Sequence, residues 1–187
     1  MNRLISSRLL PVIAALALIL PALSSCIKDD EQDYSDWKKR NDDFVTACKT
    51  ATDDNGDLEY VSYTPSWLGP QQFVLIKYHV RPEGYADMIP PMDNSTVDIK
   101  YRGMLMDSTV FDSSYERTTN GDSIYRCRPN SLIPGFWATL THLVPGDSVT
   151  VVIPSQLGYG VSGTTGIPPF STLIFDIKMK SIVSLLN

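Results

Sequence analysis

The stretch from Val97 to Ser114 reads VDIKYRGMLMDSTVFDSS and is the part of the sequence that decides the fold. Apolar and charged side chains alternate over its first six positions, from Val97 to Arg102. Such alternation is the pattern of a β-strand that turns one face to a core and the other to solvent. The stretch therefore predicts a half-buried strand.

Similar segments lie on both sides of this strand. Strand-like apolar runs occupy residues 73–80, 149–153 and 173–179. The run 134–140 lies between the segments 73–80 and 149–153 and predicts a short helix. Proline suits a first helical turn, and Pro145-Gly146 stops the helix from continuing. Strands far outweigh helix, so the sequence predicts an α+β domain in which an antiparallel sheet packs on one short helix.

Length, composition and charge limit the class of protein. The chain has 187 residues, 43% of them apolar, and a formal net charge of −5. This length predicts one folded domain with appendages, and the apolar content is sufficient for a core. The acidic balance argues against a nucleic-acid partner, because nucleic-acid binders normally present a basic face.

The first 26 residues have the features of a bacterial secretory signal. Arg3 and Arg8 precede an apolar run from Leu9 to Leu20, and small residues follow it. The run is shorter than the ~20 residues that cross a bilayer, so we predict a cleaved signal peptide over residues 1–25. Leu23-Ser24-Ser25-Cys26 resembles a lipobox. We therefore predict that Cys26 is lipidated and anchors the mature chain to a membrane.

Two segments separate Cys26 from the strand-rich part of the chain. Residues 26–33 are predicted to hold the lipidated cysteine and an acidic tether, and residues 34–72 are predicted to be a helical N-terminal extension. Apolar residues at helical spacing over 34–51 predict an amphipathic helix whose apolar stripe is interrupted only by Asn41. Docking on the main domain explains this stripe better than a ligand site does, and a dimer contact is an alternative.

The cysteines, glycines and histidines of the chain show no familiar catalytic or metal-binding pattern. Cys48 and Cys127 lie in no CxxC motif, so a disulfide and two separate thiols are both open. Residues 158–163 match GxGxxG, but the prolines after them exclude the helix that a dinucleotide site needs. His79 and His142 are isolated. We therefore expect no metal, no cofactor and no acid–base or nucleophilic set.

Several ordered blocks of the chain resemble the signature of FKBP-type peptidyl-prolyl cis-trans isomerases. Residues 97–114 are similar to the family's V.V.Y.G.L..G..FDSS, and residues 132–136 are similar to its VIPGW. Further similar blocks, to M..G, IP..LAYG and IPP...L.F.V.L, lie at residues 144–147, 153–160 and 167–177. The resemblance covers about residues 73–184. It implies an antiparallel sheet wrapped around one short helix, with the isomerase domain over residues 73–187.

The pocket residues of the family carry over onto this chain through the same motifs. The resemblance implies a catalytic pocket made of Tyr101, Phe111, Asp112, Ile133, Phe136, Tyr159 and Phe175, with Leu132 and Ile167 as substrate-binding residues. Phe136 stands where the family usually has the tryptophan of the pocket floor. The N–H of Ile133 and the hydroxyl of Tyr159 are the expected donors to a substrate. Arg117 lies where some members have a base that pairs with the pocket aspartate, and Tyr125 is the nearest candidate for a further aromatic.

The resemblance implies a lipid-anchored peptidyl-prolyl cis-trans isomerase that assists the folding of envelope or secreted proteins. The implied partners are proline-containing polypeptides, the membrane that holds the lipid on Cys26, and macrolide inhibitors, with no nucleic acid. The implied location is the cell envelope of a Gram-negative bacterium, on the outer membrane and facing the periplasm or the surface. Because a fold does not fix a function, a non-catalytic chaperone and a peptide- or protein-binding surface lipoprotein are the alternatives. Since all the pocket motifs lie after residue 96, the helical extension is expected to be dispensable for the chemistry.

Overall fold

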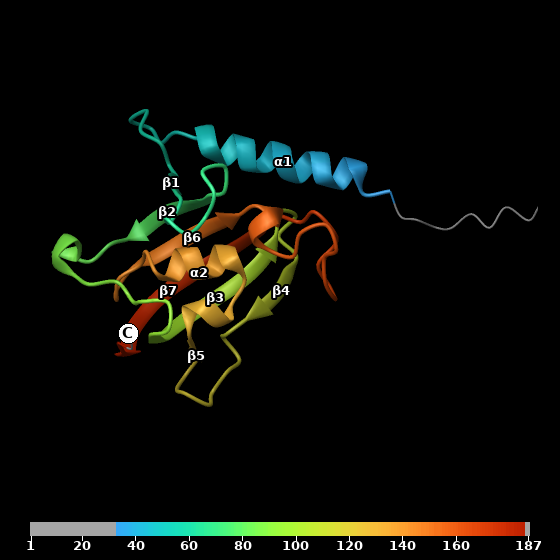
Figure 1. Cartoon of the computed structure of the whole chain (residues 1–187). Helices are drawn as coiled ribbons and strands as arrows, with labels where there is room; N and C mark the ends of the chain where they lie inside the picture. Colours follow the sequence, from blue (N-terminus) through green and yellow to red (C-terminus); the bar gives the residue numbers. More distant parts are fainter. Residues whose placement is uncertain (1–32, 186–187) are drawn as a thin grey trace, which may run out of the picture. The chain divides into compact units, whose positions relative to one another are not determined.

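The computed structural model describes residues 33–185 (Figure 1). The α-helices in this range are α1 (Ser35–Thr50) and α2 (Pro134–Leu140), and the 3-10 helices are η1 (Tyr85–Asp87), η2 (Pro129–Ser131) and η3 (Ser155–Leu157). The strands are β1 (Val61–Tyr63), β2 (Val74–Val80), β3 (Thr96–Leu105), β4 (Val110–Ser113), β5 (Tyr125–Cys127), β6 (Ser148–Ile153) and β7 (Leu173–Ser184). The expected signal peptide and Cys26 lie outside the described residues. Within the described range, no helix has the length and apolar character needed to cross a membrane.

The strands join one antiparallel sheet in the order β1-β2-β6-β7-β3-β4, and β5 also pairs with β3. The longest ladder joins β3 to β7, from Thr96 opposite Ser184 to Leu105 opposite Leu173. The antiparallel sheet, the helix over residues 134–140 and the N-terminal helix are therefore confirmed. The strands β1, β4 and β5 have only three or four residues each, too few for the sequence pattern to reveal them.

The inner face of the sheet holds the main core. Alternate side chains of β3 and β7, among them Ile99, Leu173 and Ile177, point to this face and are almost completely buried. The short helix α2 packs on them through Phe136, Ala138 and Leu140, and Figure 1 shows it crossing the sheet. The core thus lies between α2 and the curved sheet, and one end of it is lined by aromatic rings.

The outer face of the sheet carries a second apolar layer under α1. Leu75, Val152 and Ile174 are cross-strand neighbours in β2, β6 and β7, which places them in one row. Phe44 and Cys48 of α1 are part of the same cluster. Because strand side chains alternate between faces, this row is separate from the main core. The helix α1 therefore docks on the sheet, as expected from its apolar stripe.

The structure corrects one reading of that stripe and decides one open question. Asn41, the polar residue expected to interrupt the stripe, is the most deeply buried residue of α1, with no exposed surface. Its amide fits there because both its nitrogen and its oxygen are hydrogen-bonded, which offsets the cost of burying a polar group. Cys48 and Cys127 are both buried free thiols, so the chain has no disulfide between them.

Candidate functional site

A cavity of about 190 Å³ opens at one end of the main core. It is lined by Tyr101, Phe111, Asp112, Tyr125, Leu132, Ile133, Phe136, Tyr159 and Phe175. These residues come from β3, β4, β5, β7, the start of α2 and the loop between β6 and β7. We call this space the aromatic cavity, because six of the residues on its wall are Tyr or Phe. All seven residues that the resemblance assigns to the catalytic pocket lie on this wall.

The aromatic rings of the cavity hold one another edge to face. The ring of Phe136 lies 4.7 Å from that of Phe175 at 85° and 5.8 Å from that of Tyr101 at 77°. The rings of Phe111 and Phe175 meet at 88° with centroids 5.5 Å apart. Edge-to-face contacts of this kind are favourable because the positive ring edge meets the negative ring face. The floor is therefore a rigid apolar surface.

Gly103 on β3 makes this ring arrangement possible. A Cβ atom at this position would lie 2.7 Å from the ring of Phe175 and 2.8 Å from that of Phe111. Real side chains do not approach so closely, so only glycine lets both rings lie against the strand. The glycine of the YRG motif is thus a packing requirement of the cavity wall.

One side of the cavity is polar. The Tyr101 hydroxyl donates to Oδ2 of Asp112 at 2.6 Å, and Nη2 of Arg117 donates to the Tyr101 oxygen at 3.2 Å and to Oδ1 of Asp112 at 3.4 Å. The guanidinium of Arg117 also lies 4.8 Å from the ring centre of Tyr125. Burial, together with the hydrogen bond to Asp112 and its charge, raises the pKa of Tyr101. Tyr101 therefore stays protonated at neutral pH and orients the carboxylate of Asp112.

Two residues on the cavity wall carry the hydrogen-bond donors that the resemblance assigns to the site. Ile133 is the residue before the first turn of α2, and within the described part of the chain no backbone hydrogen bond uses its N–H. Tyr159 lines the cavity from the loop after η3 and is 40% exposed. The resemblance assigns both groups as donors to a ligand carbonyl.

The structure places Ile167 differently from the expectation. It packs into the main core at 4% exposure and does not line the cavity. The reason lies in the loop itself, where Thr164 and Ile167 exchange two backbone hydrogen bonds of 2.9 Å and form a tight turn. Leu132 lies on the cavity wall as expected. Tyr125 on β5, which the sequence offered as the nearest candidate for a further aromatic residue, lines the cavity too.

The structure also places His142 and the glycine-rich segment 158–163. No group of three His, Cys, Asp or Glu side chains within the described range is arranged to hold a metal ion. His142 stacks on Tyr63 with ring centres 3.9 Å apart, and burial lowers its pKa. Gly158 to Gly163 form turns and not the start of a helix. The wall of the aromatic cavity itself holds six aromatic rings and the carboxylate of Asp112, which pairs with Arg117.

This fold and cavity define the class: an antiparallel sheet around a short helix, with an aromatic binding site where the helix begins. Residues 88–180 match the family described as FKBP-type peptidyl-prolyl cis-trans isomerase. Through this domain the chain belongs to the FKBP-type family.

Relatives and solved structures agree with this assignment. The chain is 39% identical over 92 residues to the FKBP-type isomerase FkpA of Escherichia coli K12, covering 49% of this chain and 33% of that protein. It is 41% identical over 103 residues to the macrophage infectivity potentiator of Trypanosoma cruzi, covering 53% of this chain and 48% of that protein. It thus spans a third to a half of these two relatives.

Among solved structures, FkpA from Escherichia coli superimposes with a TM-score of 0.61 at 29% identity, over 81% of this chain and 62% of that one. A peptidyl-prolyl isomerase from Pseudomonas syringae superimposes with a TM-score of 0.63 at 22% identity, over 81% of this chain and 97% of that one. The second comparison supports the fold alone.

Proposed function

We propose that this protein is a peptidyl-prolyl cis-trans isomerase that rotates X-Pro bonds in the aromatic cavity. One observation carries the proposal: the cavity brings together the seven expected catalytic residues from five separate segments of the chain. The substrates proposed are proline-containing polypeptides, and macrolides that occupy the same apolar site are proposed inhibitors.

The physical problem is the amide resonance of the X-Pro bond, which sets a rotation barrier of ~18–20 kcal/mol. The planar amide is more dipolar than the twisted one, so a site that removes water favours the twisted state. The rings of Phe136, Phe175 and Phe111 supply such a site and a flat surface for the proline ring. The N–H of Ile133 and the hydroxyl of Tyr159 donate to substrate carbonyls and hold the chain on both sides of the bond.

This mechanism needs no proton transfer. Tyr101 is the titratable group that Asp112 contacts most closely, and its raised pKa keeps it neutral across the physiological range. The rate therefore depends on desolvation and positioning, and we expect it to be nearly flat from pH ~6 to ~8.

We further propose that the chain works at the bacterial cell envelope, on the outer membrane, and assists the folding of envelope or secreted proteins. Support comes from the sequence before the described residues, where a signal-like segment meets a lipobox-like motif at Cys26. The acidic residues that follow would then space the domain from the membrane surface.

The test is a prolyl isomerisation assay on short X-Pro peptides at several pH values. A catalysed rate that varies less than about twofold between pH 6 and 8 supports the mechanism. A bell-shaped profile centred near pH 7 contradicts it. A folded protein that binds the peptides without accelerating isomerisation favours the alternative, a non-catalytic chaperone or binding module.

A further inference from the structure

We propose that α1 is a positioning element of the aromatic cavity and that Asn41 is the residue through which it acts. The inference rests on the proposed isomerase function, because the cavity residue that it positions is Tyr159. It replaces the expectation from the sequence that the helical extension is dispensable for the chemistry.

The first link joins Asn41 to the start of β7. Its Oδ1 accepts a hydrogen bond from the N–H of Thr172 at 2.7 Å, and its Nδ2 donates to the carbonyl of Trp37 at 2.8 Å. Asn41 is 0% and Thr172 2% exposed, so water does not compete for these groups. Loss of the amide would leave the buried N–H of Thr172 without its partner.

A second link lies one helical turn earlier. Nε1 of Trp37 donates to the hydroxyl of Ser171 at 3.1 Å, and that hydroxyl donates to the carbonyl of Pro168 at 2.7 Å. The ammonium of Lys38 lies 5.9 Å from the ring centre of Phe170. The N-terminal half of α1 thus contacts the segment from Pro168 to Thr172, which is the last part of the loop that carries Tyr159.

Phe170 transmits this anchoring toward the cavity. Its backbone has φ 62°, an unfavourable left-handed conformation for a bulky residue, which persists only where the surroundings enforce it. In this conformation its N–H donates to the carbonyl of Gly160 at 2.8 Å. Gly160 directly follows Tyr159. The path from Asn41 to Tyr159 therefore runs through Thr172, Phe170 and Gly160.

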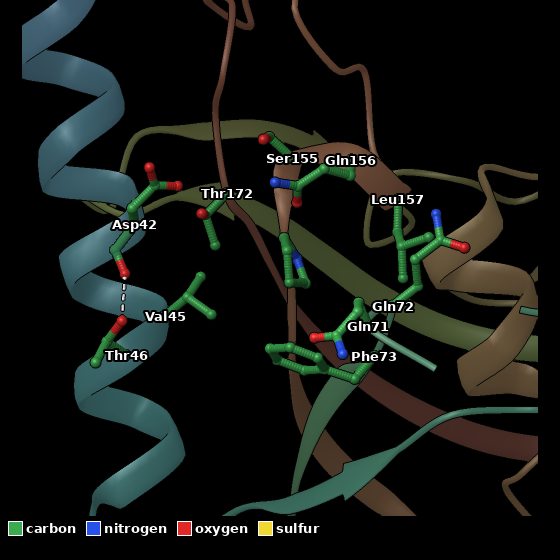
Figure 2. Close-up of a pocket in the computed structure, with 11 residues that line it drawn as sticks. Asp42, Val45, Thr46, Gln71, Gln72, Phe73, Ser155, Gln156, Leu157 and Thr172 are labelled. Carbon is green, nitrogen blue, oxygen red and sulfur yellow. Dashed lines mark hydrogen bonds between the residues drawn. The ribbon is translucent and has the colours of Figure 1, made fainter. Parts of the chain in front are cut away.

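The surroundings of α1 favour this path over a direct one. A groove of about 420 Å³ is lined on one side by Asp42, Val45 and Thr46 of α1 and on the other by Ser155, Gln156 and Leu157 of η3 (Figure 2). Thr172 also lies on its wall. The groove separates α1 from η3, the segment that leads into Tyr159. The helix therefore contacts the loop at the loop's other end, at residues 168–172.

The test compares two truncations on the same face of α1 in the full chain. Asn41→Ala removes the link to Thr172, whereas Cys48→Ala, seven residues later, removes a contact with the outer-face row and leaves the loop untouched. We expect Asn41→Ala to lower kcat/KM on an X-Pro peptide about five- to tenfold, mainly by raising KM. Cys48→Ala should leave kcat/KM and KM within about twofold of the wild type.

Two further measurements separate positioning from lost stability. In a Tyr159→Ala background, Asn41→Ala should add less than about twofold, because the residue it positions is gone. Amide exchange at Phe170 should accelerate at least about tenfold in Asn41→Ala and stay unchanged in Cys48→Ala. Equal effects of the two truncations on KM and on exchange would overturn the proposal.

The exchange measurement needs no turnover. If the wild type does not catalyse isomerisation, the proposed function fails, and faster exchange at Phe170 in Asn41→Ala would still support the structural coupling. If the wild type is active and both truncations leave KM and exchange unchanged, the positioning role alone fails.

Discussion

At the scale of single residues, Phe136 is the group on which the proposed mechanism depends most. It is 4% exposed and contacts the rings of both Phe175 and Tyr101. We expect Phe136→Leu, which keeps an apolar side chain but removes the flat ring, to lower kcat/KM by about tenfold or more. The measurement is the isomerisation rate on a short peptide, with folding checked by circular dichroism.

Trp137 provides the control for this change. It is the next residue of α2, but its ring stacks on Trp67 at 4.1 Å and does not line the cavity. Trp137→Leu should therefore leave kcat/KM within about twofold of the wild type. A folded Phe136→Leu that is as active as Trp137→Leu would remove the ring from the mechanism.

Asp112 and Tyr159 should matter less than the floor. Asp112→Asn weakens the bond that orients Tyr101 without opening the cavity, and Tyr159→Phe deletes a single hydroxyl. The net contribution of one hydrogen bond is ~0.5–1.5 kcal/mol, which corresponds to a several-fold change in rate. We expect the loss of kcat/KM to decrease from Phe136→Ala through Asp112→Asn to Tyr159→Phe. The reverse order would show that donors, not the apolar floor, dominate.

Cys127 makes stability depend on pH at the alkaline end. Burial raises the pKa of its thiol from 9.0 to about 12, so above pH 9 the unfolded chain releases a proton that the folded chain retains. The resulting stabilisation is complete below pH 9 and is lost between pH 9 and about 12. Urea unfolding should show that the wild type loses about 1–2 kcal/mol more between pH 8 and 10.5 than Cys127→Ala does. Parallel losses in the two proteins would contradict the buried neutral thiol.

At the scale of secondary-structure elements, the outer face of the sheet depends on the row formed by Leu75, Val152 and Ile174. Leu75 is completely buried and belongs to the same apolar cluster as Cys48 of α1. We expect Leu75→Ala to lower the free energy of unfolding by about 2–4 kcal/mol, from lost burial and the cavity left behind. Denaturant unfolding followed by tryptophan fluorescence measures it.

The matched control lies on β1, which pairs with β2 through Ser62 opposite Leu75. Val61 on this strand is 52% exposed. Val61→Ala should change the free energy of unfolding by no more than about 0.5 kcal/mol. A loss as large as that of Leu75→Ala would mean that the edge strand, and not the covered row, stabilises this face.

At the scale of the whole molecule, the proposed lipid on Cys26 decides where the domain works. Metabolic labelling with a fatty-acid analogue should tag the wild-type chain and fractionate it with membranes. Cys26→Ala should abolish the label and release the protein from the membrane fraction, because the thiol that takes the lipid is absent. Equal labelling of both proteins would rule out this anchor, while leaving the cavity and its chemistry unaffected.

Much of the architecture follows from local patterns along the chain. The alternation over Val97 to Arg102 and the proline at the start of α2 predict elements that the structure contains, because strand and helix periodicity report directly on buried faces. The outer-face row has a signal as well, since β2, β6 and β7 each hold three consecutive apolar residues around it. Such runs indicate that both faces of a strand are covered, although they do not name the covering element.

Two placements, those of Asn41 and Ile167, show where local pattern is insufficient. Asn41 reads as a break in an apolar stripe, yet it is buried because Thr172, 131 positions away in sequence, supplies its partner. Ile167 occupies the position of a pocket residue in the motif, yet a turn in its own loop directs it into the core. The partner of Asn41 is distant in sequence, and the turn at Ile167 depends on backbone hydrogen bonds with Thr164, which the pattern of apolar residues does not report.

By itself, the sequence determined the strand-rich domain and its single inner helix, because these follow from side-chain periodicity. Its resemblance to the FKBP-type family indicated eight residues of the aromatic cavity, the seven catalytic ones and Leu132. Tertiary structure alone decided that α1 covers the outer face, that Cys48 and Cys127 remain free thiols, and that Asn41 is joined to the loop bearing Tyr159. The physical reason is that burial and hydrogen-bond partners are properties of the packed chain, in which residues far apart in sequence shield one another from water.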